Sequence, residues 1–118
     1  MATSSNEAVR PVELVLDLHA VNSLEDFQKL SSALFGFPDF YGNNMRAWVD
    51  CVRSIRDPDE GLTKFFVKKN EILVLKIVGF NHIEKNVPEL VNLLFWAIAA
   101  CNASEAYIGR PPILTCSF

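Results

Sequence analysis

The chain has 118 residues and a formal net charge of −3; half of its residues are hydrophobic and 21% are charged. This length and composition fit one folded domain with a substantial core, and they exclude a disordered chain. No run of lysine and arginine is long enough to follow a phosphate backbone, so we expect no direct nucleic-acid binding.

We expect a flexible polar tail over residues 1–10 and a single domain over residues 11–118. The tail lacks the apolar segment of a signal peptide. The most apolar run, residues 93–101, is shorter than the roughly 20 residues that span a bilayer. Three cysteines without a framework spacing predict reduced thiols. These features predict a cytoplasmic protein that does not enter a membrane.

The first predicted elements are a strand and a helix. Residues 12–18 are nearly continuously apolar, which is typical of a strand covered on both faces. Asn22 and Glu25 have the spacing of a capping box and precede apolar residues at helical spacing. Gly36 and Pro38 then predict the end of this helix.

A second helix is predicted by apolar residues that recur every three or four positions. They are Met45, Trp48, Val49, Val52 and Ile55. Asn43 or Asn44 is its expected N-cap. Arg46, Asp50 and Arg53 lie on the opposite side, and the spacing of Arg46 and Asp50 allows them to pair along the helix.

The remaining elements complete an alternation of strands and helices. Residues 57–61 predict a turn, residues 72–78 a second strand, residues 88–101 a long apolar helix and residues 113–118 a final strand. Strands separated by helices favour parallel pairing. We therefore expect an α/β fold with a three-stranded, mostly parallel sheet packed with helices. A hairpin between residues 62–67 and the second strand is the alternative.

Motifs for catalysis and for cofactors are missing from the sequence. The two histidines, His19 and His82, lack metal-site spacing, and no glycine-rich phosphate loop is present. His19 follows the first strand, where active sites of α/β proteins lie, and only the fold could bring it to Cys51. We predict no enzyme activity, no catalytic residues, no metal and no cofactor. An enzyme that uses His19 or Cys51 is the third reading.

The loop before the second helix combines aromatic residues with small hydrogen-bonding residues, as interface hot spots do. These residues are Phe37, Phe40, Tyr41, Gly42, Asn43 and Asn44. We expect Phe37 to lie in the core. For Phe40 and Tyr41, the residues alone leave a core role and a binding role open.

Residues 39–51, DFYGNNMRAWVDC, resemble the signature of the barstar family, which inhibits barnase-type ribonucleases. In that family, an aromatic pair, a glycine, a polar residue and an asparagine precede a helix that carries an Asp-Cys pair. The order of the predicted elements also matches, and the clear likeness covers residues 18–55. The resemblance implies a barstar-like fold in which this loop and helix plug the ribonuclease active site.

The resemblance also implies a role for individual residues. Gly42 and Asn44 match the family, Cys51 matches a cysteine on the helix, and Asp50 matches a central carboxylate that mimics an RNA phosphate. Phe40 falls where the family has a contacting tyrosine, so the hydroxyl is missing here. The implied partner-binding residues are Phe40, Tyr41, Gly42, Asn44, Met45, Arg46, Val49 and Asp50.

Two positions depart from the family pattern. Arg46 stands where the family has an acidic residue, and Phe95, Trp96 and Ala97 stand near the position of an expected acidic residue on the last helix. Because charge complementarity excludes wrong partners, these departures predict a partner that is not a close copy of barnase. The resemblance implies an immunity protein that neutralises a ribonuclease-type toxin, with residues 39–53 as the occluding segment.

The alternative function is a barstar-like interaction module or regulator with a non-ribonuclease partner or with a second copy of itself. The apolar helix over residues 88–101, with Phe95 and Trp96, could supply a dimer face. The competing reading is that this helix lies buried between the sheet and a second helix. We expect a monomer when free, with a weak dimer as the alternative.

Overall fold

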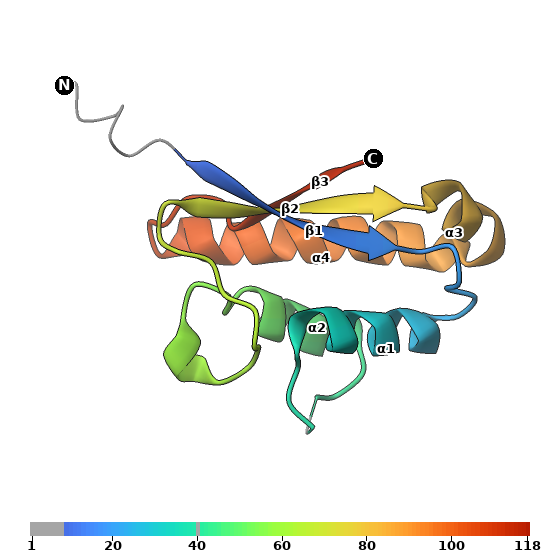
Figure 1. Cartoon of the computed structure of the whole chain (residues 1–118), viewed down its shortest axis with the longest axis horizontal. Coiled ribbons are helices and arrows are strands. Elements are labelled where there is room, and N and C mark those ends of the chain that lie inside the picture. The colour runs from blue at the N-terminus through green and yellow to red at the C-terminus, as the bar shows by residue number, and fades with distance from the viewer. Residues whose placement is uncertain (1–8, 40) are drawn as a thin grey trace.

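The computed structural model describes residues 9–39 and 41–118 (Figure 1). Its elements are β1 (Arg10–Asp17), α1 (Leu24–Phe35), α2 (Met45–Val52), a 3-10 helix (Pro58–Glu60), β2 (Glu71–Val78), α3 (Phe80–Asn86), α4 (Pro88–Tyr107) and β3 (Leu114–Ser117). The strands pair in the order β1-β2-β3, and both pairings are parallel. The predicted three-stranded α/β fold is confirmed. Of the predicted tail, residues 1–8 lie outside the described residues, and Arg10 already belongs to β1.

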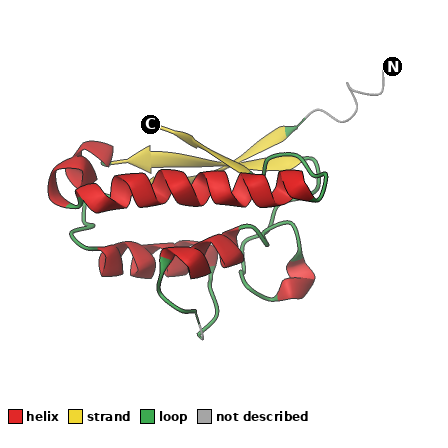
Figure 2. Ribbon diagram, turned by 180° about the vertical axis from the view of Figure 1, so that it is seen from behind, coloured by secondary structure: helices red, strands yellow, loops and turns green. Residues whose placement is uncertain are grey.

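The described helices α1, α2 and α4 all lie on one side of the sheet. Figures 1 and 2 show α4 directly against the strands, with α1 and α2 in a further layer beyond α4. On the other face of the sheet Glu13, Lys76 and Val15 are exposed, Val15 by 55%. The expectation that the first strand is covered on both faces is therefore wrong. The expected burial of the apolar helix between the sheet and a second helix agrees with the position of α4.

Helix α1 begins with a capping box one residue later than the sequence analysis predicts. Ser23 Oγ accepts a hydrogen bond from the backbone N–H of Asp26 at 3.0 Å, and Asp26 Oδ2 accepts one from the backbone N–H of Asn22 at 2.9 Å. Ser23, rather than Asn22, is the N-cap, and Asp26 takes the place assigned to Glu25. Gly36 ends the helix in the left-handed conformation, as predicted.

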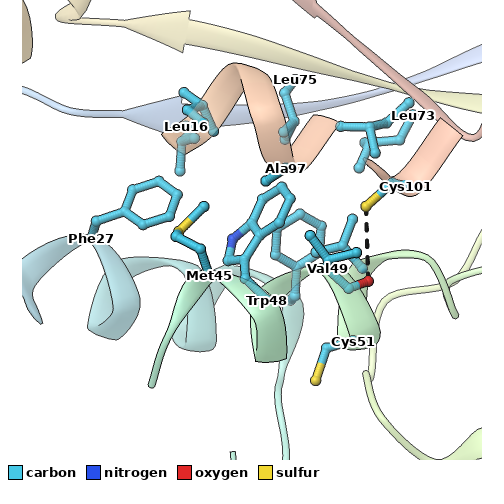
Figure 3. Packing of buried hydrophobic residues seen from close by; sticks show 14 of the residues in the cluster. Leu16, Phe27, Met45, Trp48, Val49, Cys51, Leu73, Leu75, Ala97 and Cys101 are labelled. Atoms are coloured by element: carbon cyan, nitrogen blue, oxygen red, sulfur yellow. Dashed lines mark hydrogen bonds between the residues drawn. The ribbon is translucent and has the colours of Figure 1, made fainter. Parts of the chain in front are cut away.

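The core is built around Trp48, whose side chain is fully buried (Figure 3). Its ring centroid lies 6.1 Å from that of Phe27 and 6.1 Å from that of Phe35, both on α1. Leu16 and Leu75 reach the same cluster from the sheet. Each fully buried large apolar side chain stabilises the fold by roughly 1.5–3 kcal/mol. Trp48 therefore joins the outer helical layer to the rest of the molecule.

Two segments differ from the sequence expectations. Residues 62–67 form no strand, because the backbone N–H groups of Lys64 and Val67 donate to the carbonyls of Phe35 and Ile55 at 2.9 Å each. The hairpin alternative is therefore wrong. Helix α3 was not predicted, and α4 continues past residue 101 to Tyr107. None of the described helices is long and apolar enough to cross a membrane.

A buried arginine crosslinks distant segments. The Arg56 side chain is 2% exposed and donates to Glu105 Oε1 at 3.1 Å. It also donates to three backbone carbonyls, those of Glu71 (2.9 Å), Pro111 (2.7 Å) and Pro112 (2.7 Å). Arg56 thereby ties the chain after α2 to the end of α4, to the start of β2 and to the approach to β3.

Arg110 extends this network toward the surface. It donates to Glu105 Oε2 at 2.8 Å and to both carboxylate oxygens of Asp57 at 3.0 Å. The hydrogen bond from the Arg110 side chain lowers the pKa of the Asp57 carboxyl. Glu105, which is 1% exposed, is therefore neutralised from two sides.

Replacing Arg56 with methionine should destabilise the fold by about 3–5 kcal/mol. The change removes the donor to the buried carboxylate oxygen Oε1 of Glu105 and to three backbone carbonyls. Unfolding by urea, followed by circular dichroism, measures the loss. The control is Lys29→Met, which removes an exposed cation that lies 3.9 Å from Glu25. That loss should stay below about 1 kcal/mol. Equal losses for the two variants would contradict a structural role for Arg56.

Candidate functional site

The segment predicted to bind a partner lies on the helical side of the molecule. Figure 1 shows the loop between α1 and α2 projecting from the helical layer, away from the sheet. Helix α2 follows directly and presents one of its faces to solvent. We call the exposed residues of this loop and of α2 with its C-cap the loop-helix surface; they are Gly42, Asn43, Asn44, Arg46, Asp50 and Arg53.

Asn44 fixes the junction between the loop and α2. Its backbone is extended, and its Oδ1 accepts a hydrogen bond from the backbone N–H of Ala47 at 2.8 Å. Its Nδ2 donates to the carbonyl of Gly42 at 3.3 Å. Asn43 has a φ of +54°, a left-handed conformation that asparagine tolerates better than most residues. Asn44 is therefore the N-cap, which is one of the two residues predicted for this role.

The predicted partner-binding residues divide into a buried and an exposed group. Tyr41, Met45 and Val49 are buried, with exposed fractions of 8%, 8% and 9%. The exposed group consists of Gly42, Asn44, Arg46 and Asp50. Phe40 lies outside the described residues, and Phe37 is buried as expected. The sequence pattern does not distinguish the residues that support the loop-helix surface from those that form it.

Tyr41 anchors the loop to α1. Its hydroxyl donates to Gln28 Oε1 and lies 3.4 Å from the carbonyl oxygen of Asn44. Gln28 Nε2 in turn donates to the sulfur of Met45 at 3.2 Å. Burial raises the pKa of the Tyr41 hydroxyl, so it remains a neutral donor. These contacts hold the loop against the first turn of α2 in the absence of a partner.

The exposed face of α2 carries charges in the order positive, negative, positive. Arg46, Asp50 and Arg53 are spaced at four and three residues, so they lie on one side of the helix. Asp50 Oδ1 lies 3.6 Å from Arg53 Nε. The sequence spacing suggested that Asp50 pairs with Arg46. In the structure Asp50 pairs with Arg53 instead. The Asp50 side chain remains 59% exposed.

A small hollow lies beside Asp50. It has a volume of about 210 Å³ and is lined by Pro38, Tyr41, Gly42, Ala47, Asp50, Cys51 and Leu62. Asp50 supplies the only carboxylate in this lining. A cationic or hydrogen-bond-donating side chain of a partner would find an acceptor there together with an apolar surface.

The fold and this surface define a small α/β domain in which α2 presents an exposed, charged face. The family model described as Barstar (barnase inhibitor) matches residues 12–108, which is well over half of the chain. The chain therefore belongs to the barstar family. A search of the curated proteins found no match. The matched range contains the whole loop-helix surface.

The residues of the third, enzymatic reading do not come together. Within the described residues, no hydrogen bond joins Cys51 to either histidine, and no three His, Cys, Asp or Glu residues are grouped as metal ligands. Burial, and then the charge of Asp50, raise the pKa of the Cys51 thiol to about 11. Figure 3 shows Cys51 on the side of α2 that is turned away from Trp48. Its thiol therefore favours the protonated, unreactive form.

The structure reveals a pair that the sequence analysis missed, Asp17 and His19 at the end of β1, with 2.8 Å between Asp17 Oδ1 and His19 Nδ1. A carboxylate two residues before a histidine, just after an apolar strand, was the available signal. Asp17 is the last residue of β1, so this pair lies at the carboxyl end of that strand, and His19 lines a different hollow from the one beside Asp50.

The thiols of the folded chain should react slowly with a chromogenic disulfide reagent at about pH 8, because burial raises the pKa of all three cysteines and so lowers the thiolate fraction. After denaturation, the same titration should release three thiols per chain. A fast burst from the native protein that Cys51→Ala abolishes would contradict this expectation and would revive a nucleophilic role.

Proposed function

We propose that this protein inhibits a ribonuclease-type toxin and acts as its immunity protein, occluding the active site with the loop-helix segment of residues 39–53. Its membership of the barstar family supports the proposal. The observation that carries it is the exposed carboxylate of Asp50 beside a hollow on α2. A carboxylate placed among the basic groups of a ribonuclease can take the position of an RNA phosphate.

The burial of individual residues suggests how the proposed contacts are divided. Gly42, Asn44, Arg46 and Asp50 are exposed and would contact the partner directly. Tyr41, Met45 and Val49 would act by holding the loop and α2 in the binding geometry, and Phe40 remains a proposed contact. A surface that is already ordered loses less conformational entropy on binding.

The charge order on α2 constrains the partner. A uniformly basic active site would attract Asp50 but repel Arg46 and Arg53, and juxtaposed like charges lower both affinity and association rate. The proposed partner therefore places a cation opposite Asp50 and an acidic or neutral group opposite Arg46. The inhibitor would work in the cytoplasm of the producing cell, as a single domain over residues 11–118 that is monomeric when free and needs no cofactor.

The second candidate is an interaction module or regulator with a different protein partner or a second copy. The exposure of Phe95 (45%) and Trp96 (46%) on α4 favours it, because large exposed apolar side chains often mark contact surfaces. A chain that binds no ribonuclease yet forms a concentration-dependent dimer in light scattering would favour this candidate over the first.

Asp50→Ala should weaken binding of the ribonuclease encoded beside this gene by about thirtyfold or more, a loss of about 2 kcal/mol. The wild-type chain should co-purify with that enzyme in equimolar amounts and inhibit RNA cleavage. Asp59→Ala, an exposed aspartate in the 3-10 helix, is the matched control and should bind as the wild type does.

Because Asp50 is exposed, its replacement should leave the melting temperature nearly unchanged. A lower melting temperature with binding intact would show that Asp50 is a structural residue. The absence of both complex formation and inhibition with the wild-type chain would rule out the proposed function.

Arg46→Asp should strengthen binding to barnase itself by about tenfold or more, because it removes a positive charge that faces a basic site. The same change should weaken binding to the cognate toxin. Lys29→Asp makes an identical charge change on the exposed face of α1 and serves as the control for long-range attraction. Equal effects of the two substitutions, measured by titration calorimetry, would refute a local contact at Arg46.

A further inference from the structure

A larger hollow is lined by residues around the carboxyl ends of the strands, and it shares no lining residue with the hollow beside Asp50. It has a volume of about 460 Å³ and is lined by His19, Ile77, Gly79, Phe80, Asn81, His82 and Phe118. His19, Gly79 and Phe118 follow the ends of β1, β2 and β3 in turn. Open α/β sheets bind ligands outside the carboxyl ends of their strands. We call this hollow the strand-end pocket.

Aromatic rings form one wall of the strand-end pocket. The centroids of Phe80 and Phe118 lie 4.9 Å apart with an interplanar angle of 73°, and Phe95 lies 6.1 and 6.0 Å from them. Phe118 nevertheless remains 66% exposed. An exposed cluster of edge-to-face rings offers both apolar area and a ring surface to a planar molecule.

His19 supplies an oriented hydrogen-bond acceptor to the lining of the pocket. Asp17 Oδ1 accepts from the backbone N–H of His19 at 3.0 Å and from His19 Nδ1 at 2.8 Å. A carboxylate can only accept, so Nδ1 carries a proton, and in the Nδ1–H tautomer Nε2 is the acceptor. Within the described chain, Nε2 forms no hydrogen bond. The backbone N–H of His19 and then its ring lower the pKa of Asp17, which keeps this orienting carboxylate charged.

The second histidine of the lining offers no free nitrogen. His82 Nε2 lies 3.0 Å from Asn22 Oδ1, and His82 Nδ1 lies 3.2 Å from Asn86 Nδ2. Both ring nitrogens are therefore engaged by asparagine side chains, and His82 contributes ring surface alone. His19 Nε2 is left as the unengaged imidazole acceptor of the strand-end pocket.

Gly79 allows the close approach of His19 to the end of β2. Its φ is +81°, and a Cβ at this position would lie 2.8 Å from the backbone nitrogen of His19 and 3.0 Å from the ring atoms Cγ and Cδ2. Only glycine satisfies both the left-handed backbone and this close approach. The imidazole is thus packed against the backbone at the end of β2.

We propose that the strand-end pocket binds a small planar aromatic molecule that carries an O–H or N–H donor. The ring packs on Phe80 and Phe118, and the donor hydrogen-bonds to His19 Nε2. Phenols, indoles and nucleobases share this chemistry. Anionic aromatics are disfavoured, because the nearby Asp17 carboxylate repels a second negative charge. The pocket volume lies within the range of roughly 300–1,000 Å³ that small-molecule sites occupy. This inference does not depend on the proposed ribonuclease partner.

Titration of the labelled full chain with phenol, followed by ¹H–¹³C and ¹H–¹⁵N NMR, tests the proposal. Saturable shifts are expected at the His19 ring, Gly79 and Phe118, with a dissociation constant on the order of 1 mM. Toluene matches the ring but lacks the donor, and benzoate replaces the donor with an anion, so both should bind at least about tenfold more weakly. Equal binding of toluene, or no saturable shift with phenol, would overturn the proposal.

Two variants test whether phenol binding depends on the acceptor atom His19 Nε2 or on aromatic packing alone. His19→Phe keeps an aromatic ring against Gly79 and removes Nε2, so phenol binding should fall to the level of toluene binding. Asp17→Asn removes the carboxylate that fixes the tautomer and should also weaken phenol binding, whereas Asp59→Asn, far along the chain, should not. Unchanged phenol binding by both pocket variants would refute the role of His19. Separate titrations with indole and adenosine then distinguish simple aromatics from nucleobases.

Discussion

The arrangement of this molecule depends on one buried cation, the guanidinium of Arg56. It satisfies three backbone carbonyls from two separate segments and one oxygen of Glu105 at the end of α4. A buried carbonyl without a donor costs about 1–3 kcal/mol, so no apolar residue could replace these contacts without strain elsewhere. Because Arg56 follows α2 closely in the chain, the same contacts fix the helix that carries Asp50 relative to α4 and the sheet. The position of the candidate site is thus set by a residue outside it.

Helix α2 has a buried face and an exposed face, and the packing of the first fixes the position of the second. Its inner face buries Trp48, Met45 and Val49 in the core, while its outer face presents Arg46 and Asp50 to solvent. Since the buried face leaves α2 little freedom to move, the core fixes the backbone positions from which the exposed charges project. Such preorganisation lowers the entropic cost of association. A rigid charged helix can therefore select partners by the position of charge and not only by net charge.

Local patterns predicted much of the fold, and long-range contacts account for what they missed. The spacing of apolar residues located α1, α2, β2 and α4, and Asn44 was among the predicted caps. A strand covered on one face and a strand covered on both faces can have the same apolar sequence, so the exposure of Val15 was not predicted. Helix α3 is too short for a periodic signal. Arg56 and Glu105 are 49 positions apart, and no local pattern connects them. In the candidate site, the motif could not tell buried Met45 from exposed Arg46.

The layered arrangement has a consequence for how the two proposed sites would relate. The loop-helix surface lies beyond α4 from the sheet, whereas the strand-end pocket lies at the carboxyl end of the strands (Figure 1). The two hollows share no lining residue, so a protein seated on α2 need not contact His19 or Phe118. Any coupling would have to pass through packed elements such as α4, whose Phe95 contacts the aromatic wall while its Cys101 thiol reaches the carbonyl of Val49 on α2 at 3.8 Å. A ligand that binds two positions of α4 with equal affinity does not change the equilibrium between them. The two sites should therefore act independently unless α4 itself moves.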